Sequence, residues 1–367
     1  MRVAPAVLAA MVAAGAVTVG SAQHAGDHPP GSTPGMVRTP GQRPAERAPA
    51  VAAAYPPRLA TARAFDEAVR VEVRGLPTAQ ADAALRAAVE EIREVEDLVD
   101  PAGPGDGAGL AAILAAGGSE RAVDPRLADL LARSLSFCRW SLGAHGPLGG
   151  RLYRLWEEAA RGRARPTPEA LRQAVESAGC DGLEAEATAA TARLVADGRL
   201  DLRGFARGFA VDRAVEVLRG RGVVNGLVEV GWVRRAFGGG VDGSGWPVLL
   251  PVFPGETRPA DRLSLRDRAV AVVSTVHRPL VVAGDPVAPW LDQRDGSPAE
   301  GLVGVAAATE LAVDAEALAV ALAVLGNREG TLRLISLRPA PAVLWLLGDC
   351  GGAPLVSHHH WSELSVR

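Results

Sequence analysis

The sequence predicts an α+β protein with one large folded domain, built as a single unit or as two tightly merged lobes. Patterns typical of amphipathic helices and of strands occur throughout residues 59–355, and neither an internal repeat nor a break in composition divides them. Of the 367 residues, 48% are hydrophobic and 22% are charged, which is ordinary for a globular protein with a large core.

Charge and residue usage exclude several classes of function. The net charge of −3 and the lack of a basic run argue against a nucleic-acid partner. All 39 basic residues are arginine, so no chemistry that needs lysine is available. The three cysteines, Cys138, Cys180 and Cys350, have no metal-binding spacing. They are either buried small hydrophobic residues or include a single disulfide.

The N-terminus is predicted to be a signal peptide over residues 1–22. Arg2 precedes an apolar run rich in Ala and Val, and small residues suit cleavage before Gln23. No cysteine follows the run directly, which argues against a lipid anchor, while an uncleaved membrane anchor is the alternative. We therefore expect an exported protein, periplasmic or associated with the cell envelope, that touches a membrane only through an uncleaved signal segment.

The rest of the chain divides into three predicted parts. Residues 23–58, rich in Pro, Gly and Ala, are expected to form a disordered linker. The folded domain is expected over residues 59–357, followed by a C-terminal tail over residues 358–367. The histidines His358–His360 are interpreted as part of a solvated tail or as an adventitious metal binder, because consecutive residues of a strand point to alternate sides.

Within the domain, hydrophobic spacing predicts the order of the elements. The expected helices are Thr78–Val99 with Thr78 as its cap, one that starts at Asp124-Pro125, one that contains Leu152–Trp156, one that starts at Thr167-Pro168 and ends at Gly179, and Val313–Leu325 closed by Gly326. The expected strands include residues 69–73, 246–253, 269–275, 279–284 and 302–309, a last strand over 342–348, and a hairpin with its turn at Asp197-Gly198.

The most informative stretch is Leu200–Asp212, LDLRGFARGFAVD. Leu200 and Leu202 alternate with polar residues, which predicts a short strand. A turn with Gly204 and Gly208 follows and leads into an amphipathic helix. Free backbone N–H groups at such a helix start bind anions, although glycine turns of this kind also occur for packing alone.

In the order of its motifs, from about Thr61 to Leu347, the chain resembles the FAD:protein FMN transferase (ApbE-like) family. Leu200–Asp212 matches a DLGGIAKGYAVD-like segment of that family. Four further segments match in the same order: GAHGPLGGRLYRLW (143–156), VEVGWVRRA (228–236), PWLDQRDGSP (289–298) and AEALAVALAVLG (315–326).

The resemblance implies an ApbE-like fold of mixed or antiparallel sheets packed with helices, and an exported, Mg-dependent enzyme with FAD as substrate. Such enzymes transfer FMN from FAD to a Thr or Ser hydroxyl of an acceptor flavoprotein and release AMP. The positions that it implies for flavin contacts are Ala144, His145, Gly146, Asp201, Arg207, His277 and Leu291. Those that it implies for the metal are Gly204, Glu316 and Val320.

Many polar positions of the family pattern are substituted in this sequence. An AMGT segment appears as residues 64–67 (AFDE), and a GAFD loop has His145 and Gly146 in place of Phe and Asp. The Asp and Thr that hold Mg appear as Glu316 and Val320, and valine cannot bind a cation. We therefore expect weak or absent Mg binding and weakened or lost catalysis. The alternative is a pseudoenzyme, a non-catalytic flavin-binding or protein-interaction module that keeps the fold.

Several single residues have two interpretations. Asp201 either bonds to the flavin ring or orders the turn at Gly204. His277 either points into the ligand pocket or is a hydrogen-bonded surface residue. Asp292 is interpreted as the cap of a turn.

Overall fold

The computed structural model describes residues 55–366, apart from residues 106, 163, 196–197, 252, 254–257 and 349–353. The predicted signal peptide, nearly all of the predicted linker and Cys350 lie outside the described residues. Residues 49–367 belong to one compact unit. No helix in the described part is long and apolar enough to cross a membrane.

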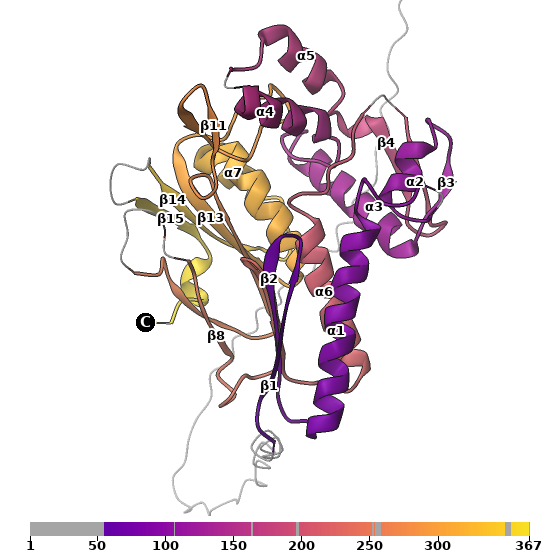
Figure 1. Cartoon of the computed structure of the whole chain (residues 1–367). Helices are drawn as coiled ribbons and strands as arrows, with labels where there is room; N and C mark the ends of the chain where they lie inside the picture. The colour runs from indigo at the N-terminus through magenta and orange to yellow at the C-terminus, as the bar shows by residue number, and fades with distance from the viewer. Residues whose placement is uncertain are drawn as a thin grey trace, which may run out of the picture. The chain divides into compact units, whose positions relative to one another are not determined.

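An eight-stranded antiparallel sheet forms the centre of this unit (Figure 1). In order across the sheet its strands are β1 (Arg58–Ala64), β2 (Glu67–Val73), β6 (Gly226–Val230), β7 (Val233–Phe237), β10 (Arg268–Ser274), β13 (Leu302–Thr309), β14 (Ala342–Leu347) and β15 (Leu355–His359). The connection from β2 to β6 spans most of the helices, so helices and strands are segregated as in an α+β fold.

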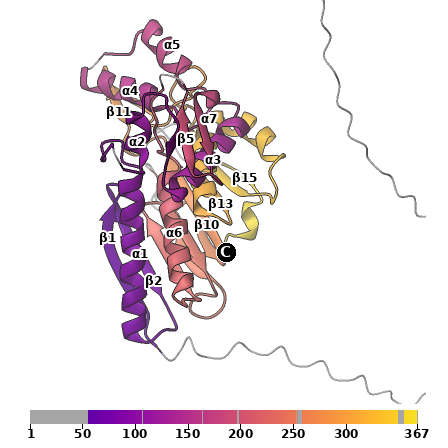
Figure 2. The same cartoon turned by 90° about the vertical axis from the view of Figure 1, so that its right-hand side faces the viewer.

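Alternation along these strands produces two separate apolar layers. In β10, for example, Ala269, Ala271 and Val273 belong to one buried cluster, whereas Val270 and Val272 belong to another. The first cluster packs under α1 (Thr78–Leu98), α6 (Ala206–Gly220) and α7 (Ala312–Leu334), which cover one face of the sheet (Figures 1 and 2). The second packs under the hairpin of β8 (Trp246–Leu249) and β9 (Arg262–Leu265) together with Trp361. Both faces of the sheet are therefore buried.

The remaining elements extend the helical side. They are α2 (Leu110–Ala115), α3 (Pro125–Trp140), α4 (Gly150–Gly162), α5 (Pro168–Glu176), the 3-10 helix η2 (Cys180–Gly182), and the short strands β3 (Arg121–Ala122), β4 (Leu183–Glu186), β5 (Thr191–Leu194), β11 (Leu280–Val282) and β12 (Asp285–Val287). The 3-10 helix η3 (Trp361–Glu363) contributes Trp361 to the second cluster, on the opposite face. A disulfide joins Cys138 of α3 to Cys180 of η2. Of the two interpretations of the cysteines, the structure therefore confirms the one with a disulfide.

The helix boundaries confirm most of the predicted signals. The carboxylate of Asp124 accepts a hydrogen bond from the Arg126 N–H, and the Thr167 hydroxyl accepts one from the Ala170 N–H. Gly326 interrupts α7 with a φ of 69°, a conformation that favours glycine. Thr78, however, is the first residue of α1 and not its cap, because Pro77 holds the cap position without a side-chain bond.

Three predicted features are wrong. Leu200 and Leu202 alternate with polar residues because both leucines are buried, but they do not belong to a strand. The predicted hairpin at Gly198 does not form, since β5 pairs with β3 and β4. The strand at residues 342–348 is not the last one, because β15 follows it.

The segment expected to be a C-terminal tail is packed onto the domain. His358 and His359 belong to β15, and Trp361 is only 3% exposed. The sequence of β15 has no pattern of buried residues that would predict a strand. The strand lies at the edge of the sheet, where Leu355 is 75% exposed.

Candidate functional site

A cavity of about 990 Å³ lies beside the N-terminal turn of α6. Its lining combines the turn between β1 and β2, the segment that leads into α6, the residues after β10, one face of α4 and a single side chain of α7. The turn consists of Phe65 and Asp66, both with positive φ, which places the AFDE segment at a hairpin tip. A cavity of this size can bury a large nucleotide.

Aromatic groups form one part of the cavity wall. The ring of His277 contacts the ring of Trp232 edge-on, with 4.8 Å between centroids, and its Nδ1 lies 3.3 Å from the Ser274 hydroxyl. Trp290 donates a hydrogen bond from Nε1 to the Ser274 carbonyl at 3.0 Å. All of these residues line the cavity, so His277 lies in the pocket. Such a surface is suited to a planar ring system.

Asp201 orders the turn before α6. Its carboxylate accepts hydrogen bonds from the backbone N–H of Arg203 at 2.9 Å and from the Arg203 Nε at 2.8 Å. The Arg203 guanidinium also contacts Glu157 and lies 4.0 Å above the Tyr153 ring. Asp201 lines the cavity as well, but its contacts in this structure are those of a turn-ordering residue.

Gly204 lies at the closest approach of three segments. Its φ of +84° is left-handed, and a Cβ at this position would lie 2.8 Å from Nε2 of His145 and 3.0 Å from Cγ2 of Val320. The fold therefore brings the predicted metal positions Gly204 and Val320 together, and only glycine fits between the neighbours.

Glu316 is the one residue of α7 in the cavity lining, and its side chain is fully buried. Its Oε1 accepts a hydrogen bond from Nε of Arg207, and its Oε2 accepts one from the backbone N–H of Gly208, both at 2.7 Å. Gly208 permits this contact because α6 and α7 touch there: a Cβ would lie 2.4 Å from the Ala312 carbonyl oxygen. The carboxylate is thus neutralised within the protein.

The other predicted flavin contacts are not in the cavity lining. Ala144, His145 and Gly146 lie buried behind it, and Leu291 is fully buried in a separate apolar cluster with α4 and β11. Gln293 holds this loop through hydrogen bonds to the carbonyls of Ala144 and Gly146.

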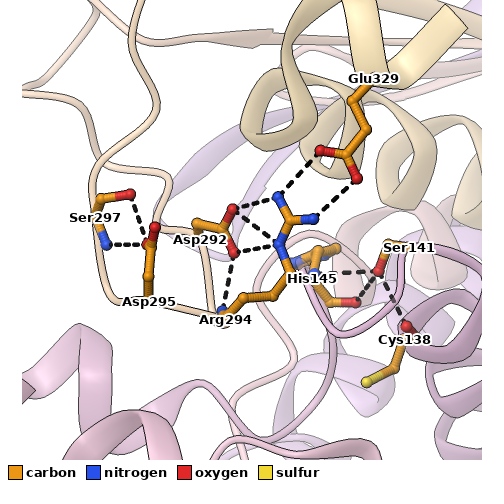
Figure 3. A network of polar contacts seen from close by, with 8 residues as sticks. All are labelled: Cys138, Ser141, His145, Asp292, Arg294, Asp295, Ser297 and Glu329. Atoms are coloured by element: carbon orange, nitrogen blue, oxygen red, sulfur yellow. Dashed lines mark hydrogen bonds and ion pairs between the residues drawn. The ribbon is translucent and has the colours of Figure 1, made fainter. Parts of the chain in front are cut away.

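His145 is 1% exposed, and its ring stacks on Phe205 with 4.6 Å between centroids. Neither ring nitrogen has a hydrogen-bond partner among the described residues, and burial lowers the pKa of His145 to about 3. Its backbone is held by the Ser141 hydroxyl, which also bonds to the Cys138 carbonyl (Figure 3). The ring is therefore neutral at pH 7.

Asp292 caps a turn, as predicted. Its carboxylate accepts a hydrogen bond from the Arg294 N–H at 2.9 Å and pairs with the Arg294 guanidinium. Arg294 in turn reaches Glu329 of α7 at 2.9 Å, so the turn is tied to that helix (Figure 3). These contacts fix the loop that holds Leu291 and Gln293.

A sequence model of the ApbE family matches residues 65–344, which is most of the described domain. The chain belongs to the ApbE family. It is 30% identical over 289 residues to the FAD:protein FMN transferase of Treponema pallidum, covering 73% of this chain and 79% of that protein. It is 25% identical over 213 residues to the Haemophilus influenzae protein of the same name, covering 56% of this chain and 62% of the relative.

Solved ApbE structures have the same fold. The crystal structure of the ApbE protein from Thermotoga maritima superposes with a TM-score of 0.74 at 22% identity, covering 84% of this chain and 100% of that one. The apo form of the Pseudomonas stutzeri flavinyl transferase ApbE gives a TM-score of 0.71 at 20% identity, covering 84% and 97%. The predicted ApbE-like α+β fold is confirmed.

The residues at the family's metal position do not fit Mg²⁺. This ion prefers several oxygen ligands around it. Here both oxygens of Glu316 already accept hydrogen bonds, and Val320 offers only hydrocarbon. The described residues contain no group of three or more His, Cys, Asp or Glu side chains that could hold a metal ion. A cation beside Glu316 would also meet the Arg207 guanidinium.

Asp212, the last residue of the best-matched family segment, has a structural role. Its carboxylate accepts hydrogen bonds from the N–H groups of Ala312 and Val313, both at 2.9 Å, and pairs with Arg235 at 2.7 Å. Asp212 lies in the neighbouring helix α6 and thereby provides the hydrogen-bond acceptors for these two N–H groups at the start of α7. Burial raises the pKa of Asp212 to about 6, against the opposing effect of Arg235 and the two N–H groups, so it is ionised at pH 7.

A charged face of α4 was not predicted from the sequence. Arg154, Glu157 and Arg161 all line the cavity, and their spacing of three and four residues places them on one side of the helix. The spacing of these three residues could have been recognised in the sequence. The contact between this face of α4 and the segment before α6 could not, because it joins residues far apart in the chain. The role of Trp290 in the cavity was missed for the same reason.

Proposed function

We propose that this protein binds FAD in the cavity beside α6 and that its capacity to transfer FMN is weak or lost. Family membership supports FAD as the ligand, because the Treponema pallidum and Haemophilus influenzae relatives are FAD:protein FMN transferases. The volume of about 990 Å³ and the wall of Trp232, His277 and Trp290 support a bulky ligand with a planar ring system.

The contacts of Glu316 carry the second part of the proposal. In the transfer, a Ser or Thr hydroxyl of an acceptor protein attacks the phosphorus on the FMN side, forms a P–O bond, and displaces AMP. The developing negative charge needs an electrophilic centre close to the diphosphate. Here the carboxylate that would hold the metal is neutralised by Arg207 and by the Gly208 N–H, and Val320 replaces the second ligand. A non-catalytic flavin-binding module is therefore the second candidate.

One assay separates these functions. The purified protein is incubated with FAD, Mg²⁺ and an acceptor peptide, and AMP, covalently bound flavin and FAD fluorescence are measured, with the Treponema pallidum relative as positive control. We expect FAD fluorescence to change on binding and AMP release to be far below that of the control. AMP release equal to the control would contradict the loss of catalysis. No AMP and no fluorescence change would contradict FAD binding.

We also propose that the protein is exported. The disulfide between Cys138 and Cys180 supports this, since such bonds persist in oxidising compartments. Labelling of free thiols in fractionated cells tests it. The mature protein should be found outside the cytoplasm with these two cysteines protected, and a reduced pool confined to the cytoplasm would contradict export.

A further inference from the structure

Arg207 lies in the cavity wall next to the carboxylate that would otherwise face a divalent cation. Its Nε donates to Oε1 of Glu316 at 2.7 Å, and its side chain is 23% exposed, whereas that of Glu316 is fully buried. An arginine anchored in this way loses little further freedom when it binds a ligand.

The two terminal nitrogens of Arg207 are available for a ligand. In the described part of the chain the guanidinium uses only Nε for a hydrogen bond, so Nη1 and Nη2 have no protein partner. Guanidinium groups bind phosphate oxygens through two parallel N–H bonds, which are stronger than bonds between neutral groups. A fixed cation with two unused donors is therefore present in the cavity wall.

Arg207 and Glu316 balance each other in charge, and the other charged groups of the lining leave a positive balance. Arg203 pairs with Asp201 and Glu157, and Arg278 pairs with Glu67. Among the described residues, Arg161 and Arg199 of the lining have no ion-pair partner, and Asp66 is the acidic side chain without one. The charge that remains is positive, which favours an anionic ligand.

We propose that Arg207 takes the place of the divalent cation, and that the cavity binds the diphosphate of FAD without a metal. This inference rests on the proposed function, since it concerns the same site. It follows from a disagreement between the residues present and the metal that the family resemblance implies. The buried Glu316 positions an internal cation instead of binding an external one.

The test measures dissociation constants of FAD and of riboflavin, which lacks phosphate, by fluorescence titration with EDTA or with Mg²⁺. For the wild-type protein we expect the FAD affinity to be the same within about twofold in both conditions. The variant Arg207→Gln/Glu316→Gln removes the cation without leaving a buried carboxylate unpaired. Its FAD affinity should fall about 10- to 100-fold, the worth of a charge-assisted hydrogen bond, while riboflavin affinity stays unchanged.

The matched control is Arg219→Gln, which removes an arginine of the same helix that pairs with Asp267 away from the cavity. It should leave both affinities unchanged, and thermal unfolding checks that each variant is folded. Two results would overturn the proposal and leave FAD binding intact. One is an FAD affinity of the wild-type protein that falls tenfold or more in EDTA. The other is a double variant that binds FAD as tightly as the wild-type protein does. No FAD binding in either condition would overturn the proposed function as well.

Discussion

The guanidinium of Arg207 and the buried carboxylate of Glu316 form an ion pair across the contact of α6 and α7, with 2.7 Å between Nε and Oε1. A second hydrogen bond from the Gly208 N–H leaves neither carboxylate oxygen without a partner. The contact forms an internal salt bridge at the position where the family resemblance implies a metal site. The ApbE fold is present, whereas the positions implied for the metal carry Glu316 and Val320.

Restoring the family's donors should restore a response to metal. In the variant Arg207→Ala/Glu316→Asp/Val320→Thr, the competing cation is gone and two oxygen ligands return. We expect its FAD affinity to rise at least tenfold on addition of Mg²⁺, measured by fluorescence titration. The variant Arg207→Ala/Glu316→Gln, which has no carboxylate at this position, is the control and should not respond. Equal affinities of the triple variant with and without Mg²⁺ would contradict this explanation of the lost site.

Replacing the buried imidazole should stabilise the protein, most strongly in acid. The folded pKa of His145, about 3, lies below the ordinary value of 6.5, so the unfolded chain takes up the proton first as the pH falls. The stability tied to the neutral ring is complete above pH 6.5 and is lost progressively toward pH 3. At pH 5 the loss is roughly 2 kcal/mol.

The variant His145→Phe keeps the stacking on Phe205 and removes this loss, together with two unpaired nitrogens. Urea unfolding at pH 5 and pH 7 measures the effect. The gain in unfolding free energy should be larger at pH 5 by roughly 2 kcal/mol. The control His358→Gln changes an exposed histidine and should leave the pH dependence as it is. An unchanged difference between the two pH values in His145→Phe would contradict the assignment.

Removing the carboxylate of Asp212 should be strongly destabilising. The variant Asp212→Ala leaves Arg235 without its partner and two N–H groups at the start of α7 unbonded. Breaking a buried pair in this way costs about 3–5 kcal/mol of unfolding free energy. The control Asp267→Asn removes an exposed partner of Arg219 and should cost less than about 1 kcal/mol. Equal effects of the two variants in urea unfolding would refute the structural role.

Two glycines of α6 should respond in opposite ways to alanine. A Cβ at Gly208 would lie 2.4 Å from the backbone oxygen of Ala312, which belongs to another helix and cannot move alone. Gly208→Ala should therefore destabilise by about 1–3 kcal/mol. Gly220 has nothing within 4 Å of a Cβ, and Gly220→Ala should be neutral or stabilise by up to about 1 kcal/mol. Thermal unfolding of both variants decides, and a stable Gly208→Ala protein would mean that α6 and α7 are not this close.

The sequence by itself determined the class of fold, most helices and strands, and the family resemblance, because these depend on local spacing and on motifs in order. It also showed that Glu316 and Val320 stand where metal ligands would be expected. It did not predict β15, whose exposed position at the sheet edge produces no buried pattern.

Tertiary structure alone decided what those residues contact. Arg207 and Glu316 are 109 positions apart, and Asp212 caps a helix 100 positions away, so no local pattern could pair them. The same is true of Ala144, His145 and Gly146, which lie behind the cavity wall although their motif resembles a flavin-contacting loop. A motif states which residues are present, whereas their charge balance and exposure depend on the neighbours that the fold brings to them.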